Sequence, residues 1–352
     1  MIPMTIKEIA EATGARFDDG DPDSFVTSVT VDSRAVTPGS LFVALPGEHA
    51  DGHDYVAGAF ERGAVAALVS RDTGGLSLVV DEPLRALTAL ASAVRARLRA
   101  VVIAITGSAG KTTTRELTAA ALSEELRTVA SSKNHNNEIG VPLTICAADQ
   151  TTQALVVEVG ARGIGHIASL MPVVRPDVAV VTNVGSAHVG MFGSIDAIAQ
   201  AKGEIVEALG TDGVAVLNAD DLRVGAMRAR AHGSVLMYGF APDADVRAED
   251  VSFGEDARAS FTVASRAERA PITLCIPGEH MISNALAAAG AALACGVSLD
   301  GAARGIARCD GVPQRMQIVR AGNRTIVNDT YNASPDSTAA ALKALVAMGR
   351  GR

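Results

Sequence analysis

The stretch VVIAITGSAGKTTTRELT, residues 101–118, decides the fold of this chain. It joins an apolar run, typical of a buried strand, to a glycine-bracketed turn and then to a helical sequence. Gly107 and Gly110 let backbone N–H groups approach phosphate oxygens without an intervening Cβ. The N-terminus of the next helix adds partial positive charge at the same place. The stretch therefore predicts a phosphate-binding loop and the use of a nucleoside triphosphate.

The predicted loop is a shortened variant, Thr-Gly-x-x-Gly-Lys-Thr. The common pattern would place a glycine at position 105, where this chain has Ile105. Lys111 is predicted to reach the outer phosphates, and the Thr112 hydroxyl to ligate Mg²⁺. The alternative is an ordinary glycine turn between a strand and a helix, with an incidental lysine.

Composition narrows the class of protein. A net charge of −8 over 352 residues argues against nucleic acid or an anionic membrane surface as a partner. The four cysteines show no C-x-x-C spacing, so a disulfide framework or zinc site is not expected and a reducing cytoplasm fits. No stretch reaches the roughly 18 uncharged apolar residues of a membrane span. We expect a cytoplasmic protein without membrane insertion.

The pattern of apolar runs predicts an α/β protein of three domains. A helical segment at 84–100 separates a small mixed α/β N-terminal domain, residues 1–98, from a central domain, residues 99–310. In the central domain apolar strands alternate with helical stretches, which indicates a mainly parallel sheet covered on both faces. The strands are expected at 101–106, 154–160, 177–185, 213–220 and 234–240, with added β structure at 244–276. A third domain begins at residue 311.

Polar residues at the ends of the strands are candidates for the site, because open parallel sheets bind ligands at the carboxyl ends of their strands. Glu158 is a carboxylate in an apolar strand, which is costly unless it meets a cation such as magnesium beside Thr112. The alternative is a strand-end glutamate that faces water. His188 comes after the next strand, and alone it is more typical of a hydrogen-bonded loop residue than of a ligand.

Lys202, in IAQAKGEIVEAL, would by itself be interpreted as a solvated helix lysine. Its place soon after the TNVGSAH segment of the same predicted sheet makes it a site candidate. Asn136, Asn137 and Asn284 offer amide donor and acceptor pairs to a base or a substrate. The alternative for each asparagine is a helix cap or a turn.

The ordered motifs of the chain together resemble the Mur ligase family, most closely its members that add D-alanyl-D-alanine. They are VDSRAVTPGSLFVALPGEHADGHDYVAGAFERGA, ITGSAGKTTTRE, NHNNEIGVPLT, VTNVGSAHVGMFGS, AKGEI, VLNADD, GEHMISNALAAAG, VPQRMQ and NDTYNASPDS. The resemblance implies an ATP-dependent amide ligase of peptidoglycan precursor synthesis, expected as a monomer. It would join D-alanyl-D-alanine to UDP-N-acetylmuramoyl-tripeptide through an acyl phosphate. The alternatives are a diamino-acid-adding relative, a folylpolyglutamate synthase-like ligase, or an inactive nucleotide-binding fragment.

The resemblance also assigns roles to residues. Catalytic roles fall to Lys111, Glu158, His188 and Lys202. Two Mg²⁺ ions would be positioned by Thr112, Glu158, His188 and a carbamylated Lys202, whose carbamate is an anion. ATP would be bound by Gly107, Ser108, Ala109, Gly110, Lys111, Thr112, Thr113, Asn137, Asn284 (adenine side), Arg315 (phosphates) and Asp329 (ribose). The UDP-linked substrate would be held by Ser33, Arg34, Gly47, Asp51, Gly52, His53 and Asp54.

Three departures from the family pattern stand out. Gln314 stands where members usually carry glycine before the arginine, and Met281 replaces a frequent asparagine after His280. The sequence ends at Arg352, after about forty residues of what resembles a Rossmann-like third domain. From this we expect a C-terminally truncated chain whose ligase activity is reduced or lost.

Overall fold

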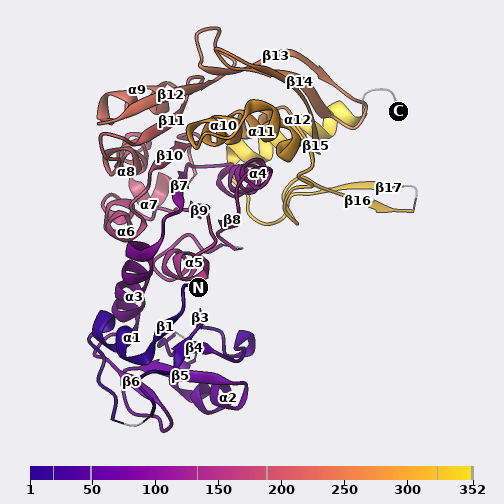
Figure 1. Cartoon of the computed structure of the whole chain (residues 1–352). Helices are drawn as coiled ribbons and strands as arrows, with labels where there is room; N and C mark the ends of the chain where they lie inside the picture. The colour runs from indigo at the N-terminus through magenta and orange to yellow at the C-terminus, as the bar shows by residue number, and fades with distance from the viewer. Residues whose placement is uncertain (19, 48–49, 133, 188, 323, 350–352) are drawn as a thin grey trace. The chain divides into compact units, whose positions relative to one another are not determined.

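The computed structural model describes residues 1–18, 20–47, 50–132, 134–187, 189–322 and 324–349 (Figure 1). The chain forms two compact units. Unit 1 comprises Met1–Ala100, Ser131–Thr152 and Pro172–Val174, and unit 2 comprises Val101–Ala130, Gln153–Met171 and Arg175–Arg352. Residues 131–152 thus group with the N-terminal part of the chain, and the domain borders at 98 and 310 stay predictions.

Unit 1 is built on a four-stranded parallel sheet in the order β3-β4-β5-β6. The strands of unit 1 are β1 (Met4–Thr5), β2 (Phe25–Val26), β3 (Ser28–Thr30), β4 (Ser40–Val43), β5 (Ala64–Val69) and β6 (Ser77–Val79). Its helices are α1 (Ile6–Thr13), α2 (Val56–Glu61), α3 (Pro83–Arg97) and α5 (Gly140–Ala147). Phe42, Val56 and Val69 pack together in its core. Thr5 and Glu8 form a reciprocal capping box that begins α1.

Unit 2 contains a nine-stranded sheet in the order β15-β14-β13-β12-β11-β10-β7-β9-β8. The strands from β8 to β13 are parallel, and β14 and β15 add antiparallel pairs at one edge. Their bounds are β7 (Val101–Thr106), β8 (Thr128–Ala130), β9 (Ala154–Glu158), β10 (Val178–Val181), β11 (Val214–Asn218), β12 (Ser234–Gly239), β13 (Val246–Phe253), β14 (Arg258–Ala264) and β15 (Arg269–Pro277). The predicted α/β class with a mainly parallel central sheet is confirmed.

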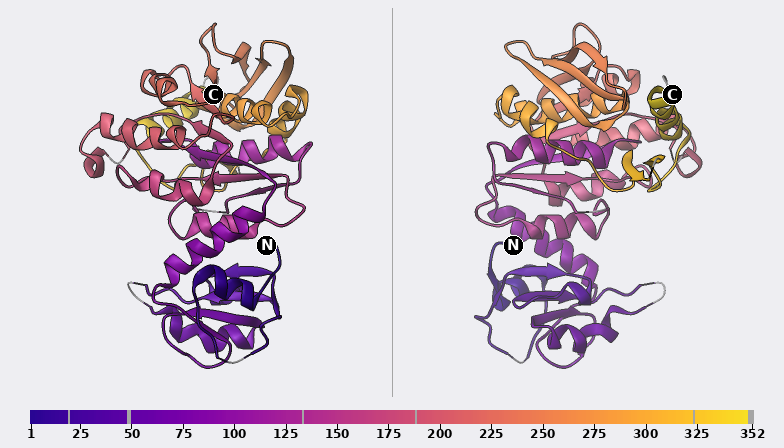
Figure 2. Two further views of the ribbon diagram at one scale, coloured as in Figure 1. Left: turned by 60° about the vertical axis from the view of Figure 1, so that its left-hand side comes forward. Right: turned by 90° about the vertical axis from the view of Figure 1, so that its right-hand side faces the viewer.

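Helices cover both faces of this sheet, with α8 and α9 on one side and α4 and α10 on the other (Figure 1). Figure 2 shows β13–β15 lying beside α10 and α11. The helices are α4 (Lys111–Ser123), α6 (His166–Val174, of which Pro172–Val174 group with unit 1), α7 (Val189–Phe192), α8 (Ile195–Glu207), α9 (Leu222–Ala226), α10 (His280–Ala294) and α11 (Leu299–Ala307). Gly305 of α11 lies so close to the α4 backbone that a Cβ would overlap the carbonyl of Ala120. This close packing buries the apolar face of α4 and fixes the helix that begins at Lys111.

The carboxyl ends of β7, β9 and β10 meet at one edge of the sheet. Ile105 pairs with Glu158, and Thr106 pairs with Val181. The predicted strand at 177–185 is too long, because β10 ends at Val181. The next residues leave the ladder and hydrogen bond to the turn between β7 and α4 instead, where Ser108 N–H donates to the carbonyl of Asn183 (2.9 Å).

Residues 311–349 form a small arm of unit 2. It consists of the antiparallel pair β16 (Gln317–Ala321) and β17 (Arg324–Asn328), and then α12 (Pro335–Gly349). Across the parts of the chain that the structure describes, no helix has both the length and the apolar character that crossing a bilayer requires.

Candidate functional site

The turn between β7 and α4 requires both of its glycines. A Cβ on Gly107 would overlap the hydroxyl of Thr182, and Gly110 has a left-handed φ of 80°. A Cβ on Gly110 would also lie 2.5 Å from Asn284 Oδ1. Both positions therefore exclude larger residues, by close approach and by backbone conformation. The turn brings the N-terminus of α4, whose first-turn N–H groups have no acceptor within the helix itself, to the carboxyl end of β7.

Lys111 is the first residue of α4 and folds back over the turn. Its Nζ donates to the carbonyl of Gly107 (2.8 Å). Burial lowers the pKa of Lys111, and the nearby Glu158 carboxylate partly offsets this effect. The ammonium therefore lies over the loop where a phosphate charge would stabilise it.

Glu158 ends β9 and is buried, with 2% of its side chain exposed. Arg115 of α4 is equally buried, and its Nη1 lies 3.5 Å from Glu158 Oε2. Arg115 also pairs with Glu116. Thr112 and Thr113 of the first turn of α4 are buried as well. The alternative of a glutamate that faces water is therefore wrong for Glu158, because its carboxylate is held inside the unit next to a cation.

Lys202 lies in α8 with only 5% of its surface exposed, so it is not a solvated helix lysine. Burial lowers the pKa of Lys202 well below its usual value, and the positive charge of Lys111 lowers it further. Lys202 thus lies close enough to Lys111 for the two positive charges to affect each other. His188, the remaining predicted metal ligand, lies outside the described residues.

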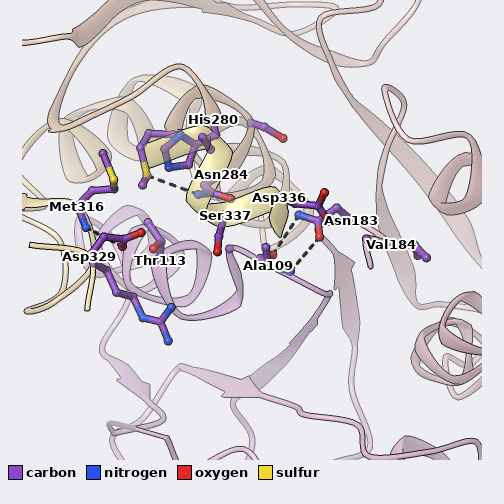
Figure 3. A pocket seen from close by; sticks show the side chains of 16 residues that line it. Ala109, Thr113, Asn183, Val184, His280, Asn284, Met316, Asp329, Asp336 and Ser337 are labelled. Carbon is purple, nitrogen blue, oxygen red and sulfur yellow. Dashed lines mark hydrogen bonds between the residues drawn. The ribbon is translucent and has the colours of Figure 1, made fainter. Parts of the chain in front are cut away.

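A pocket of about 320 Å³ opens beside the turn (Figure 3). This volume is at the lower end of the range of roughly 300–1,000 Å³ usual for small-molecule sites. The lining side chains come from the turn, the loop after β10, the start of α10, and the arm. They include the predicted nucleotide residues Ala109, Gly110, Thr113, Asn284, Arg315 and Asp329. The fold thus brings these six predicted residues into one cavity.

Asn284 lies against the turn. Its Oδ1 accepts from Thr114 Oγ1 (3.3 Å), and its Nδ2 lies 3.6 Å from Met281 Sδ. Met281, the second departure from the family pattern, is thus a direct neighbour of Asn284. The Asn284 side chain supports the turn as well as lining the pocket.

Arg315 and Asp329 reach the pocket from the arm. The Arg315 guanidinium lies 4.2 Å from the centre of the Tyr331 ring, and Asp329 Oδ1 accepts from Met316 N–H (3.1 Å). Gln314 has a φ of 63°. The residue that departs from the family's glycine therefore adopts the left-handed conformation that glycine adopts without cost.

Asn137 belongs to unit 1 and lies before α5. Its Oδ1 accepts from the backbone N–H groups of Ile139 (3.3 Å) and Gly140 (2.9 Å). This is the turn and cap role that was the alternative for this residue. Its predicted contact with ATP stays a prediction.

A second pocket, of about 700 Å³, lies in unit 1. Ser33, Arg34, Gly52 and Asp54, all predicted to hold a UDP-linked substrate, line it. Arg34 is exposed, and its Nε and Nη2 donate to the two Asp32 oxygens (2.9 and 2.8 Å). A cationic side chain is thus held at the pocket by a bidentate ion pair.

The other predicted residues of this group do not line the pocket but stabilise the loop that does; they are Gly47, Asp51 and His53. His53 is buried, and its Nε2 accepts from the Ser70 N–H (2.9 Å). The ring's Nδ1 therefore carries the hydrogen and donates to Asp51 Oδ1 (2.6 Å). The hydrogen bond from the His53 backbone N–H does most to lower the pKa of Asp51. The His53 ring and the Arg71 guanidinium lower it further. Gly47 N–H donates to the Ala50 carbonyl (3.0 Å) and helps to close the same loop.

Other lining residues carried no role in the sequence prediction, among them Asn183, Asp336 and Met316. Asn183 contacts Ala109, and Asp336 Oδ2 accepts from both N–H and Oγ of Ser186 (3.1 Å each). Met316 lines the cavity beside Arg315. A signal was present for Asn183, because it lies two residues after the end of β10, a strand that pairs with β7 just before the turn. Asp336 and Met316 reach the pocket only through the fold of the arm.

Comparison with known proteins adds independent information. The model of the Mur ligase middle domain matches residues 105–292, and that of the Mur ligase family, catalytic domain, matches residues 25–95. The chain is 39% identical to UDP-N-acetylmuramoyl-tripeptide--D-alanyl-D-alanine ligase of Mycobacterium tuberculosis, over 98% of this chain and 74% of that protein.

Solved structures agree with these matches. MurF from Acinetobacter baumannii superposes with a TM-score of 0.89 at 32% identity, over 98% of this chain and 77% of that one. MurF ligase from Thermotoga maritima in complex with ADP has a TM-score of 0.79 at 29% identity, over 91% and 75%. The chain thus spans about three quarters of the length of these similar proteins.

Proposed function

The chain belongs to the Mur ligase family, and we propose that it joins D-alanyl-D-alanine to UDP-N-acetylmuramoyl-tripeptide with ATP, through an acyl phosphate. The observation that carries the proposal is the pocket beside Gly107–Lys111, into which the fold gathers predicted nucleotide residues from the turn, α10 and the arm. The relatives named for this reaction are 39% and 32% identical to this chain over 98% of its length, which favours it over the diamino-acid-adding and folylpolyglutamate-type alternatives.

The chemistry of the proposed reaction is phosphoryl transfer and then amide formation. The terminal carboxylate of the peptide attacks the γ-phosphate of ATP and displaces ADP, which gives an acyl phosphate. This activation is needed because a free carboxylate is a poor electrophile. Lys111, at the start of α4, is placed to stabilise the charge that spreads over the transferring phosphoryl group. The amine of D-alanyl-D-alanine then attacks the acyl carbon, and phosphate leaves.

Magnesium fits the oxygen donors at this edge of the sheet. The Thr112 hydroxyl and the Glu158 carboxylate are hard ligands, and Mg²⁺ commonly combines one or two protein oxygens with phosphates and water. Within the described ranges no group of three or more His, Cys, Asp or Glu side chains forms a metal cage by itself. When bound, magnesium would neutralise phosphate charge, and Thr112 and Glu158 would supply the protein oxygens that hold it.

The proposal includes two magnesium ions and a carbamylated Lys202. Lys202 is buried on α8 near Lys111, and two ammonium groups there would repel each other. A neutral amine reacts with CO₂ by forming an N–C bond and losing one proton, which leaves a carbamate anion. That anion would attract Lys111 and offer oxygens to a second cation. His188 completes the proposed ligand set.

The pocket in unit 1 is proposed to hold the UDP-linked peptide. Arg34 presents a cation at its edge, while Gly52 and Asp54 lie on the loop that His53 braces. A diphosphate favours a nearby guanidinium and backbone N–H groups. We also propose that the protein has three domains, that it is cytoplasmic and that it is a monomer.

Phosphate release tests the function directly. The protein, with ATP, Mg²⁺ and UDP-N-acetylmuramoyl-tripeptide, is assayed with and without D-alanyl-D-alanine, and the product is identified by mass. We expect release that depends on both substrates and a product carrying the added dipeptide. L-Alanyl-L-alanine is the matched control and should not stimulate release. ADP binding without dipeptide-dependent release would instead indicate a nucleotide-binding module that is not a ligase.

A further inference from the structure

The loop after β10 is anchored to the neighbouring strands. The Thr182 carbonyl accepts from Asn218 Nδ2 (2.8 Å) and from the Tyr238 hydroxyl (3.2 Å), both buried groups of β11 and β12. Val184 N–H donates to Asp221 Oδ2 (2.7 Å). These bonds fix the backbone on both sides of Asn183.

From this anchored position Asn183 brackets Ala109 by bonding to both its N–H and its carbonyl, which belong to the two peptide planes on either side of the residue. Ala109 N–H donates to Asn183 Oδ1 (2.9 Å), and Asn183 Nδ2 donates to the Ala109 carbonyl (3.1 Å), as Figure 3 shows. Thr182 Oγ1 donates to the same carbonyl (2.6 Å), and Ser108 N–H donates to the Asn183 carbonyl (2.9 Å). With the bond from Ser108 Oγ to the Gly185 carbonyl (3.4 Å), five hydrogen bonds connect the loop after β10 to two consecutive residues of the turn.

The bracket has a specific chemical requirement at position 183. A carboxamide presents a donor and an acceptor on one short side chain, whereas an ionised aspartate presents acceptors only. An aspartate there would still accept from Ala109 N–H but would face the Ala109 carbonyl with a negative charge. Alanine would remove both bonds. The two substitutions therefore separate the loss of the bracket from the addition of charge.

The orientation of the Ala109 peptide affects the next residues of the turn. Ala109 immediately precedes Gly110, which has a φ of 80°, and Lys111, which begins α4. Successive N–H groups in such a turn converge on an anion only if each peptide plane keeps its orientation. The Gly110 N–H shares a peptide plane with the Ala109 carbonyl, so holding that carbonyl sets the direction of the Gly110 N–H, immediately before the first N–H of α4 at Lys111.

We propose that Asn183 is the positioning residue of the phosphate-binding turn, and that it favours a nucleoside di- or triphosphate over a monophosphate. The inference rests on the proposed function, because it takes the turn to bind the outer phosphates of a nucleotide. Asn183 acts through Ala109 and is not itself a reacting group.

Competition binding on the whole protein tests this. ADP and AMP are each titrated against a fluorescent ADP analogue for the wild type, Asn183→Ala, Asn183→Asp and Gln153→Glu. Gln153 is the matched control, since its Oε1 accepts from Arg127 N–H (3.0 Å) in unit 2 and a carboxylate keeps that bond. We expect ADP affinity to fall about tenfold in Asn183→Ala and about a hundredfold in Asn183→Asp. AMP affinity should change less than about threefold, and Gln153→Glu should match the wild type.

Thermal unfolding without nucleotide and binding of the UDP-linked peptide monitor folding of the variants. Thr182→Val, which removes one donor to Ala109 and leaves the carboxamide, is a milder variant and should weaken ADP by about threefold. Wild-type ADP affinity in both Asn183 variants, or an equal loss of ADP and AMP, overturns the inference. Failure of the wild type to bind ADP overturns the proposed function and this inference with it.

Discussion

The two pockets of the molecule are assembled in opposite ways. The pocket of unit 1 lies within residues 31–62, and its supporting bonds are mostly short in sequence, as in the Asp32–Arg34 and Asp51–His53 pairs two residues apart. The pocket of unit 2 takes residues from Ala109 to Ala340. There Thr114 bonds to Asn284 across 170 residues, and Ser186 bonds to Asp336 across 150.

This difference indicates what each pocket depends on. A pocket closed by local bonds forms wherever its own loop folds, whereas a pocket gathered from distant segments requires the sheet and α10 to be in place first. We therefore expect ligand binding in unit 1 and nucleotide binding in unit 2 to respond independently to substitutions. Single substitutions in each pocket test that independence.

Replacement of Lys111 should give the largest effect. Lys111→Ala removes the cation at the start of α4, and ATP turnover should fall by more than about a hundredfold. Affinity for the UDP-linked peptide, measured by calorimetry, should remain within about twofold of the wild type. Lys7→Ala, at an exposed site of α1, is the control. Comparable loss of both ligands would contradict the separation of the two pockets.

Lys202 should show a large effect that a small molecule reverses. Lys202→Ala removes the proposed carbamate, so turnover should fall by about a hundredfold while the UDP-linked peptide still binds. Acetate or formate at millimolar concentration should restore part of the rate, because a carboxylate replaces the missing anion in the space that the side chain leaves. Lys343→Ala, exposed on α12, should need no rescue. Full activity of Lys202→Ala without added carboxylate would exclude the carbamate.

Much of unit 2 was predictable because its signals are local. The apolar runs of β7, β9, β10 and β11 and the glycines of the turn determine their own conformation, and each was identified from a short window. The end of β10 was not, since residues after Val181 leave the ladder for bonds to a turn some seventy residues earlier. Likewise, nothing local places residues 131–152 in unit 1 or Asp336 at the loop after β10. Tertiary contacts determine where these residues lie.

Substitution of His53 tests how far ligand binding in the unit 1 pocket depends on its own loop. His53→Phe keeps a buried ring but removes the bonds to Asp51 and Ser70, so the loop carrying Gly52 and Asp54 loses its brace. Affinity for the UDP-linked peptide should weaken by about tenfold, while ADP affinity stays unchanged. His232→Phe, at an exposed position of unit 2, is the control. Weaker ADP binding in His53→Phe would mean that the two pockets are coupled.

Gln314 should give the smallest effect, and its direction is the informative part. Its φ of 63° costs an L-residue about 1 kcal/mol of folding free energy, and glycine would avoid this cost. Glycine also gives the unfolded chain more conformational freedom, which offsets about half of that gain. Gln314→Gly should therefore stabilise the protein by about 0.5 kcal/mol in denaturant unfolding, whereas Gln200→Gly inside α8 should destabilise it by about 1 kcal/mol. Because the adjacent Arg315 belongs to the pocket assembled from distant segments, a more stable arm should leave ADP binding equal or tighter. Destabilisation by Gln314→Gly would show that the glutamine side chain contributes more than its backbone conformation costs.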